Sequence, residues 1–111
     1  MKAVVVDGSF GIENLKLVER PVPEPGPGQV LVRIEAAPCN PSDLVFMQGL
    51  YGVKKPLPAV PGWEGAGTVV ASGGGLMGKW LTGKRVACGG QVESDGTWAE
   101  YYLADVKGCV P

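Results

Sequence analysis

Glycine and proline most strongly limit what this chain can fold into, because 18 glycines and 10 prolines fill 28 of its 111 positions. Proline interrupts helices and removes donors from a sheet, whereas glycine is favoured in turns. A hydrophobic content of 45% is nevertheless typical of a globular protein rather than a disordered one. We therefore expect one folded domain with many short elements and many turns.

Most apolar residues recur with the two-residue period of β-strands. The clearest half-buried strand is expected at residues 30–37, where apolar side chains alternate with Arg33 and Glu35. Trp98 and Tyr101 lie on another expected strand, and we expect both in the core. Turn-forming residues separate the other strand-like segments, which lie at residues 3–6, 15–19, 68–71, 85–88 and 98–103.

One segment is a good helix candidate. Asn40 can cap its start, Pro41 suits the first helical position, and Asp43 is favourable near the positive end of the helix dipole. Gly49 is placed to end the helix after about two turns. The four prolines within residues 20–28 predict an extended surface loop ahead of the main strand. Together these elements predict a mainly β fold, a small and mostly antiparallel β-barrel.

Charge and cysteine usage argue against several classes of function. Ten basic residues against eleven acidic ones leave a net charge of -1, and their scatter argues against nucleic-acid binding. The N-terminal apolar run of four residues is too short for a signal segment or a membrane span. The three cysteines form no C-x-x-C pair, and this sparse, odd number fits a reducing compartment. We therefore expect a cytoplasmic protein that binds neither nucleic acid nor membranes.

A glycine-rich string at residues 73–78 satisfies the G-x-G-x-x-G pattern of dinucleotide-binding loops. Such a loop needs a long helix behind it, whose N-terminal N–H groups face the pyrophosphate. Here Gly83 and then another expected strand follow the string. Residues 78–84 also give G-x-x-x-x-G-K, but Arg85 stands where a P-loop has Ser or Thr. We expect the string to form a plain turn.

Three motifs carry a family resemblance: Asn-Pro-Ser-Asp at 40–43, Gln-Gly-Leu-Tyr-Gly at 48–52 and Pro-Gly-Trp-Glu-Gly at 61–65. Together with residues 30–32 and 96–101, they resemble the N-terminal catalytic domain of the medium-chain dehydrogenase/reductase superfamily. The resemblance covers residues 1–111 and implies a GroES-like, partly open β-barrel with one or two short helices. Within the superfamily, the motifs are most similar to those of zinc-independent quinone oxidoreductases and 2-enoyl thioester reductases.

The chain departs from the zinc-dependent alcohol dehydrogenases of that superfamily. In those enzymes a cysteine ligand stands at the position resembling Asn40, and a histidine ligand at the position resembling Trp63. An amide oxygen is a poor zinc ligand and an indole is none, and Cys39 is one position out of step. The four-cysteine lobe that holds structural zinc in those enzymes has no counterpart here. We therefore expect neither a catalytic nor a structural zinc, and no other metal site.

The resemblance also implies a set of site residues. Tyr51 is the candidate hydrogen-bond donor to the charge that develops on a substrate oxygen, and Asn40 would bind cofactor or substrate. Asp43 and Trp63 are candidates to line the cleft, and Glu64 is expected to be a hydrogen-bonded residue at the barrel lip. Each has a purely structural alternative, namely ring packing for Tyr51, helix capping for Asn40, a favourable helix-dipole position for Asp43 and core filling for Trp63.

Enzymes of this superfamily bind NADPH mainly in a separate Rossmann domain, which follows the barrel and is absent from residues 1–111. The resemblance thus implies a catalytic-domain fragment of a zinc-independent, NADPH-dependent reductase of a quinone, enone or enoyl thioester, inactive alone. Its expected partners are a small-molecule substrate and the missing nucleotide-binding domain. The alternatives are a stand-alone GroES-like binding or assembly module, or an alcohol dehydrogenase-like enzyme of unknown substrate.

Overall fold

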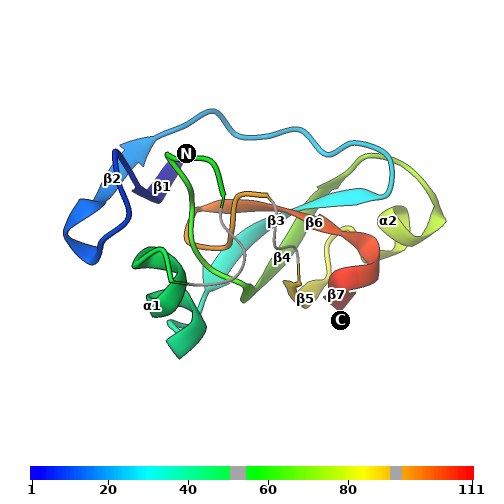
Figure 1. The fold of residues 1–111 in the computed structure, drawn as a ribbon. Coiled ribbons are helices and arrows are strands. Elements are labelled where there is room, and N and C mark those ends of the chain that lie inside the picture. Colours follow the sequence, from blue (N-terminus) through cyan, green and yellow to red (C-terminus); the bar gives the residue numbers. More distant parts are fainter. Residues whose placement is uncertain (51–54, 91–93) are drawn as a thin grey trace.

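Two antiparallel sheets and two short helices make up the structure, a computed structural model that describes residues 1–50, 55–90 and 94–111 (Figure 1). The smaller sheet pairs β1 (Lys2–Val6) with β2 (Leu15–Glu19). The larger sheet has the order β6-β3-β4-β5-β7. Its strands are β3 (Gln29–Ala36), β4 (Glu64–Ser72), β5 (Arg85–Gly89), β6 (Tyr101–Asp105) and β7 (Cys109–Val110).

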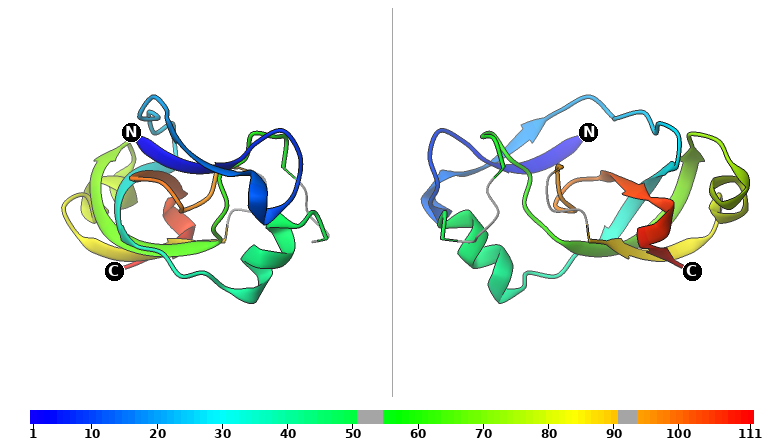
Figure 2. Two further views of the ribbon diagram at one scale, coloured as in Figure 1. Left: turned by 90° about the vertical axis from the view of Figure 1, so that its left-hand side faces the viewer. Right: turned by 45° about the vertical axis from the view of Figure 1, so that its right-hand side comes forward.

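The helices are α1 (Pro41–Met47) and α2 (Leu76–Leu81). They lie at opposite ends of the molecule, with α1 beside the smaller sheet (Figure 2). The proline-rich residues 20–28 run between these ends and join β2 to β3, as an extended loop without regular structure. The expected mainly β fold with short helices is confirmed, and within the described ranges the two sheets do not close into a barrel.

The main core surrounds β3, which pairs with β4 on one side and β6 on the other. Val30 and Val32 are completely buried, and Leu31 between them is 7% exposed, so both faces of the strand are covered at its start. Since a strand alternates its side chains between two faces, the expected polar face appears only further along, at Arg33 and Glu35. This arrangement makes β3 the centre of the larger sheet.

Helix α1 brings a second core to the other end of the molecule. It begins at Pro41, as expected, and Gly49 lies just beyond it with a φ of 75°, a conformation that glycine adopts easily. Phe46 and Met47 are each 1% exposed and pack against Val6 of β1. This packing fixes the C-terminal end of α1 relative to β1.

Three expectations about elements were wrong in detail. The expected strand at residues 68–71 extends over all of Glu64–Ser72, because Gly65 and Gly67 pair with β5 as regular strand residues. The string at residues 73–78 is more than a plain turn, since α2 begins within it at Leu76. At six residues, α2 is still far shorter than the helix of a dinucleotide-binding loop.

The aromatic residues of β6 are the third correction. We expected Tyr101 in the core, but Tyr102 is the buried residue at 2% exposure, and Tyr101 is only partly buried. The strand lies at Tyr101–Asp105 rather than at residues 98–103, and its buried face carries Tyr102 and Ala104, so Tyr101 is on the opposite face. Trp98, just before the strand, packs partly buried against both smaller core clusters. In the described part of the chain, the helices are too short to cross a membrane.

Candidate functional site

The N-terminus of α1 meets the first residue of β4 at the candidate site. The Asn40 side-chain amide Nδ2 donates a hydrogen bond to Glu64 Oε1, at 3.1 Å. Asn40 is partly buried and Glu64 exposed, so this pair forms a polar edge that faces solvent. The sequence analysis assigned the two residues to separate motifs, and the structure brings them together. The expected hydrogen-bonded role of Glu64 is thereby confirmed.

Asp43 lies beneath this polar edge and is completely buried. Its Oδ2 accepts a hydrogen bond from the Asn40 backbone N–H at 2.8 Å, which satisfies one of the unpaired amides at the helix start. Its Oδ1 is also buried and has no hydrogen-bond partner among the described residues. The structural alternative for Asp43, a favourable place in the first turn of the helix, is therefore at least part of its role.

Trp63 precedes β4 and packs edge-on against Phe46 of α1, with ring centroids 5.4 Å apart and an interplanar angle of 74°. Edge-to-face contacts of this kind stabilise a pair of aromatic rings beyond their buried area. Trp63 stays only partly buried and lines a cavity next to β4 and β5. Trp63 therefore packs against the core and also lines this cavity, and its place at a substrate cleft stays a prediction.

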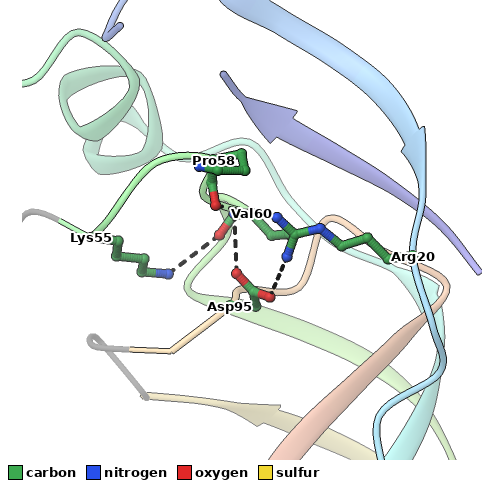
Figure 3. Close-up of polar contacts among 5 residues, drawn as sticks. All are labelled: Arg20, Lys55, Pro58, Val60 and Asp95. Atoms are coloured by element: carbon green, nitrogen blue, oxygen red, sulfur yellow. Dashed lines mark hydrogen bonds and ion pairs between the residues drawn. The ribbon is translucent and has the colours of Figure 1, made fainter. Parts of the chain in front are cut away.

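Lys55 is a site residue that sequence reasoning missed. It is 5% exposed, and its Nζ lies 4.7 Å from the Trp63 ring centroid and 5.4 Å from that of Phe46. The same Nζ donates a hydrogen bond to the Val60 carbonyl at 3.3 Å (Figure 3). Burial lowers the pKa of the Lys55 ammonium, and the negative charges of Asp95 and Asp43 partly offset this effect.

An open cavity of about 800 Å³ adjoins the polar edge. Most of its lining is apolar or backbone, from the end of β3, the start of β4 and the end of β5, while Trp63 and Glu64 contribute large side chains. Cys88 of β5 also borders the cavity, but burial raises the pKa of its thiol to about 12. Since only a thiolate is an effective nucleophile, Cys88 is unsuited to covalent chemistry at neutral pH.

Metal binding finds little support in the donor set of this site. Among the residues that the structure describes, no three Cys, Asp or Glu side chains are grouped so that they could hold an ion. Asn40 and Glu64 offer only oxygen ligands, and the Trp63 indole offers none. Zinc in proteins is bound mainly by thiolates and imidazoles, so these residues do not fit a zinc ion. The absence of zinc from the active protein remains a prediction.

The sequence analysis also singled out Tyr51, Cys39 and the glycine-rich string at residues 73–78. Tyr51, the expected hydrogen-bond donor, falls outside the described residues. Cys39 directly precedes Asn40 and is exposed, with a free thiol. The glycine-rich string before α2 is at the opposite end of the molecule from α1 (Figures 1 and 2). The site therefore rests on Asn40, Asp43, Trp63 and Glu64 from the sequence, with Lys55 added by the fold.

Comparison with known proteins matches residues 26–111 to the alcohol dehydrogenase GroES-like domain. Among curated relatives, the synaptic vesicle membrane protein VAT-1 homolog of Rattus norvegicus is 42% identical over 102 residues, which is 90% of this chain and 24% of that protein. A mitochondrial enoyl-[acyl-carrier-protein] reductase of Arabidopsis thaliana is 39% identical over 109 residues, or 94% of this chain and 27% of that enzyme. The chain thus spans about a quarter of the length of these relatives.

A solved structure shows the same fold. The crystal structure of a candidate NADPH:quinone reductase from Mesorhizobium loti superimposes with a TM-score of 0.89 and 36% sequence identity. The match covers all of this chain and 36% of that one. The expected GroES-like architecture is therefore confirmed.

Proposed function

Because this chain belongs to the alcohol dehydrogenase GroES-like domain family of the medium-chain dehydrogenase/reductase superfamily, we propose that it is the catalytic domain of an NADPH-dependent oxidoreductase. Its substrate would be a quinone, an enone or an enoyl thioester. The similarity to an enoyl reductase and to a candidate quinone reductase supports this choice. Quinones, enones and enoyl thioesters all have a carbonyl conjugated to a carbon–carbon double bond, and all accept a hydride.

The observation that carries this proposal is a polar edge beside an apolar cavity, with no donor set for zinc. Asn40 and Glu64 form the edge, and Trp63 supplies an aromatic wall. A largely apolar cavity with a few placed polar groups is the usual form of a small-molecule site. A flat, conjugated substrate would pack against the indole, while the Asn40 amide would bind a polar group of the substrate or cofactor.

NADPH supplies the hydride when it is bound. The described residues offer no phosphate-binding loop of their own, since the six-residue α2 is too short and lies far from α1. We propose that a nucleotide-binding domain outside this chain provides most of the cofactor site. Without a metal to polarise the substrate carbonyl, hydrogen-bond donors must stabilise the developing negative charge, and Tyr51 is our candidate for this role.

The direct test is to express the product of the complete gene and to follow NADPH oxidation with a quinone, an enone and an enoyl thioester. We expect turnover with at least one of these compounds, no stoichiometric zinc, and no activity from the 111-residue chain alone. A natural protein that ends at Pro111, or one that oxidises no NADPH with any of the three, would instead favour a stand-alone binding module. Turnover restricted to simple alcohols or aldehydes would indicate the alcohol dehydrogenase alternative.

The role of Tyr51 can be examined in the same assay. Replacing Tyr51 by Phe removes only the hydroxyl, and we expect kcat to fall by roughly one to three orders of magnitude, as for other lost acids or oxyanion donors. Tyr101→Phe is the matched control and should leave kcat unchanged, because Tyr101 of β6 borders a different cavity, beside Arg20 and Asp95, and not the one at Trp63 and Glu64. An unchanged kcat for Tyr51→Phe would mean that the Tyr51 hydroxyl has no part in catalysis and would favour the ring-packing alternative.

A further inference from the structure

Lys55 is a buried cation, which is rare because lysine loses strong hydration when it leaves water. At 5% exposure, it is nearly as buried as the apolar core around it. A buried ammonium is tolerated only where nearby groups compensate for its lost hydration. The contacts of Lys55 therefore indicate what the charge is used for.

The Lys55 ammonium joins two aromatic rings that come from different elements. Its Nζ lies within cation–π range of the Phe46 ring of α1 and of the Trp63 ring before β4, at 5.4 and 4.7 Å from the centroids. The hydrogen bond to the Val60 carbonyl, at 3.3 Å, fixes the head group to the segment between them. One charge thus links α1, the approach to β4 and the cavity wall.

Two carboxylates, from different parts of the chain, partly balance this charge. Asp43 contributes from the first turn of α1, and Asp95 from the loop before β6, where it also receives an ion pair from Arg20 (Figure 3). Asp43 Oδ1 is buried and unpaired among the described residues, so the nearby cation is its main compensation. Burial and these charges act in opposite directions on the pKa of Lys55, and burial is the larger effect.

We propose that Lys55 is a positioning residue of the active site, which holds the Trp63 ring and the Asn40–Asp43 helix start in their working geometry. This inference rests on the proposed reductase function. Lys55 acts through Trp63, the aromatic wall, and through Asp43, which orients the Asn40 backbone beneath the polar edge. The positive charge, and not only the volume of the side chain, is what the site requires.

Two substitutions separate charge from volume. Lys55→Met keeps an unbranched side chain of similar size but removes the charge, whereas Lys55→Arg keeps a cation that also stacks on aromatic rings. The matched control is Lys84→Met, because Lys84 Nζ lies 4.7 Å from the Trp80 centroid, outside the site. Circular dichroism and thermal unfolding establish that each variant is folded.

The first measurement follows the three indole N–H resonances of the 111-residue chain by NMR, assigned with single Trp→Phe variants. We expect Lys55→Met to displace and broaden the Trp63 resonance and Lys55→Arg to restore it near its original position. Lys84→Met should move only the Trp80 resonance. A Trp63 resonance that is the same in the Met variant and the parent chain, or equally displaced by Met and Arg, contradicts the positioning role.

The second measurement is kinetic and uses the complete gene product. We expect Lys55→Met to lower kcat/KM about tenfold, Lys55→Arg to recover most of this loss, and Lys84→Met to have no effect. If the unmodified protein reduces none of the three compounds, the proposed function is wrong, while the NMR result still decides whether Lys55 holds Trp63. If the unmodified protein is active and Lys55→Met is equally active, the positioning role is wrong.

Discussion

The Cys88 thiol lies only 4% exposed where β5 borders the cavity. Burial raises its pKa to about 12, and the neighbouring Cys109 thiol adds to this shift. Its Sγ contacts the Gly65 carbonyl of the adjacent strand at 3.6 Å. Cys88 is therefore held as a neutral thiol in the folded chain, and its protonation is linked to folding.

This linkage predicts a loss of stability at alkaline pH. Above the ordinary thiol pKa of about 8.5, the unfolded chain releases the Cys88 proton while the folded chain keeps it, so the free energy of unfolding falls as pH rises. Between pH 9 and 10.5, the free-energy difference between the parent chain and Cys88→Ala should shrink by about 1 kcal/mol per pH unit. Urea unfolding at several pH values measures this difference.

Cys39→Ala is the control for the alkaline effect, because it removes a thiol that is exposed and not buried. Its difference from the parent chain should not change with pH. The lowered pKa of Lys55 makes the free energy of unfolding rise with pH, which is the opposite direction. All these variants keep Lys55, so its effect cancels when they are compared with the parent chain. A pH-independent difference for Cys88→Ala would show that the thiol ionises as readily in the folded state.

At the residue scale, the sequence identified those members of the site that belong to short motifs. Asn40, Asp43 and Trp63 stand at fixed places in such motifs, and the structure brings them to one end of the molecule. Lys55 could not be found in this way, because a lysine beside another lysine is typical of a solvated segment. Its burial results from the packing of α1 against the chain before β4, which no local pattern reveals.

At the element scale, β3 and β4 are held unusually close at one point. Gly67 of β4 pairs with Ile34 of β3, next to an irregularity in the register. A Cβ on Gly67 would collide with the Arg33 carbonyl of the facing backbone. A strand glycine at such a point marks a close backbone approach. The two strands could admit a larger residue only by moving apart.

Gly67→Ala should therefore destabilise the chain by about 2 kcal/mol or more, the range for overpacking a close-fitted site. Gly26→Ala is the matched control, because a Cβ there meets only the flexible end of Gln29 at 3.4 Å and the backbone has no positive φ. This control should lose no stability. Urea unfolding followed by tryptophan fluorescence measures both, and equal midpoints would mean that β3 and β4 separate easily.

The same strand shows how far local patterns predict elements. Alternation marked β3 well and the capping residues marked the start of α1, since both signals are local. The first half of β4 was missed because Gly65 and Gly67 have low strand propensity, and pairing with β3 and β5 overrides this preference. The two-residue β7 exists only through its pairing with β5, so its own sequence carries no strand signal.

At the scale of the whole molecule, backbone contacts join the smaller sheet to the segments that lead into β4 and β6, among them hydrogen bonds from the Val4 N–H to the Trp98 carbonyl and from the Glu100 N–H to the Lys2 carbonyl. Single bridges connect Ala3 with Ala99 and Val6 with Ala59. Beyond these, Arg20 follows β2 and pairs with Asp95 at 2.7 Å, while its second guanidinium nitrogen donates to the Pro58 carbonyl at 3.2 Å (Figure 3). This pair connects the end of the small sheet with the loop before β6 and the segment before β4.

The Arg20–Asp95 pair should therefore couple the opening of the two sheets. Arg20→Met removes both polar contacts but keeps much of the apolar stem, and we expect faster hydrogen exchange at the β1 and β2 amides, with β3 and β4 amides little changed. Lys16→Met is the control, because its pair with Asp7 lies within the small sheet region and is exposed. Equally faster hydrogen exchange in both sheets would mean that the sheets open only together. The Arg20–Asp95 pair would then contribute to the stability of the whole chain and not to the contact between the sheets.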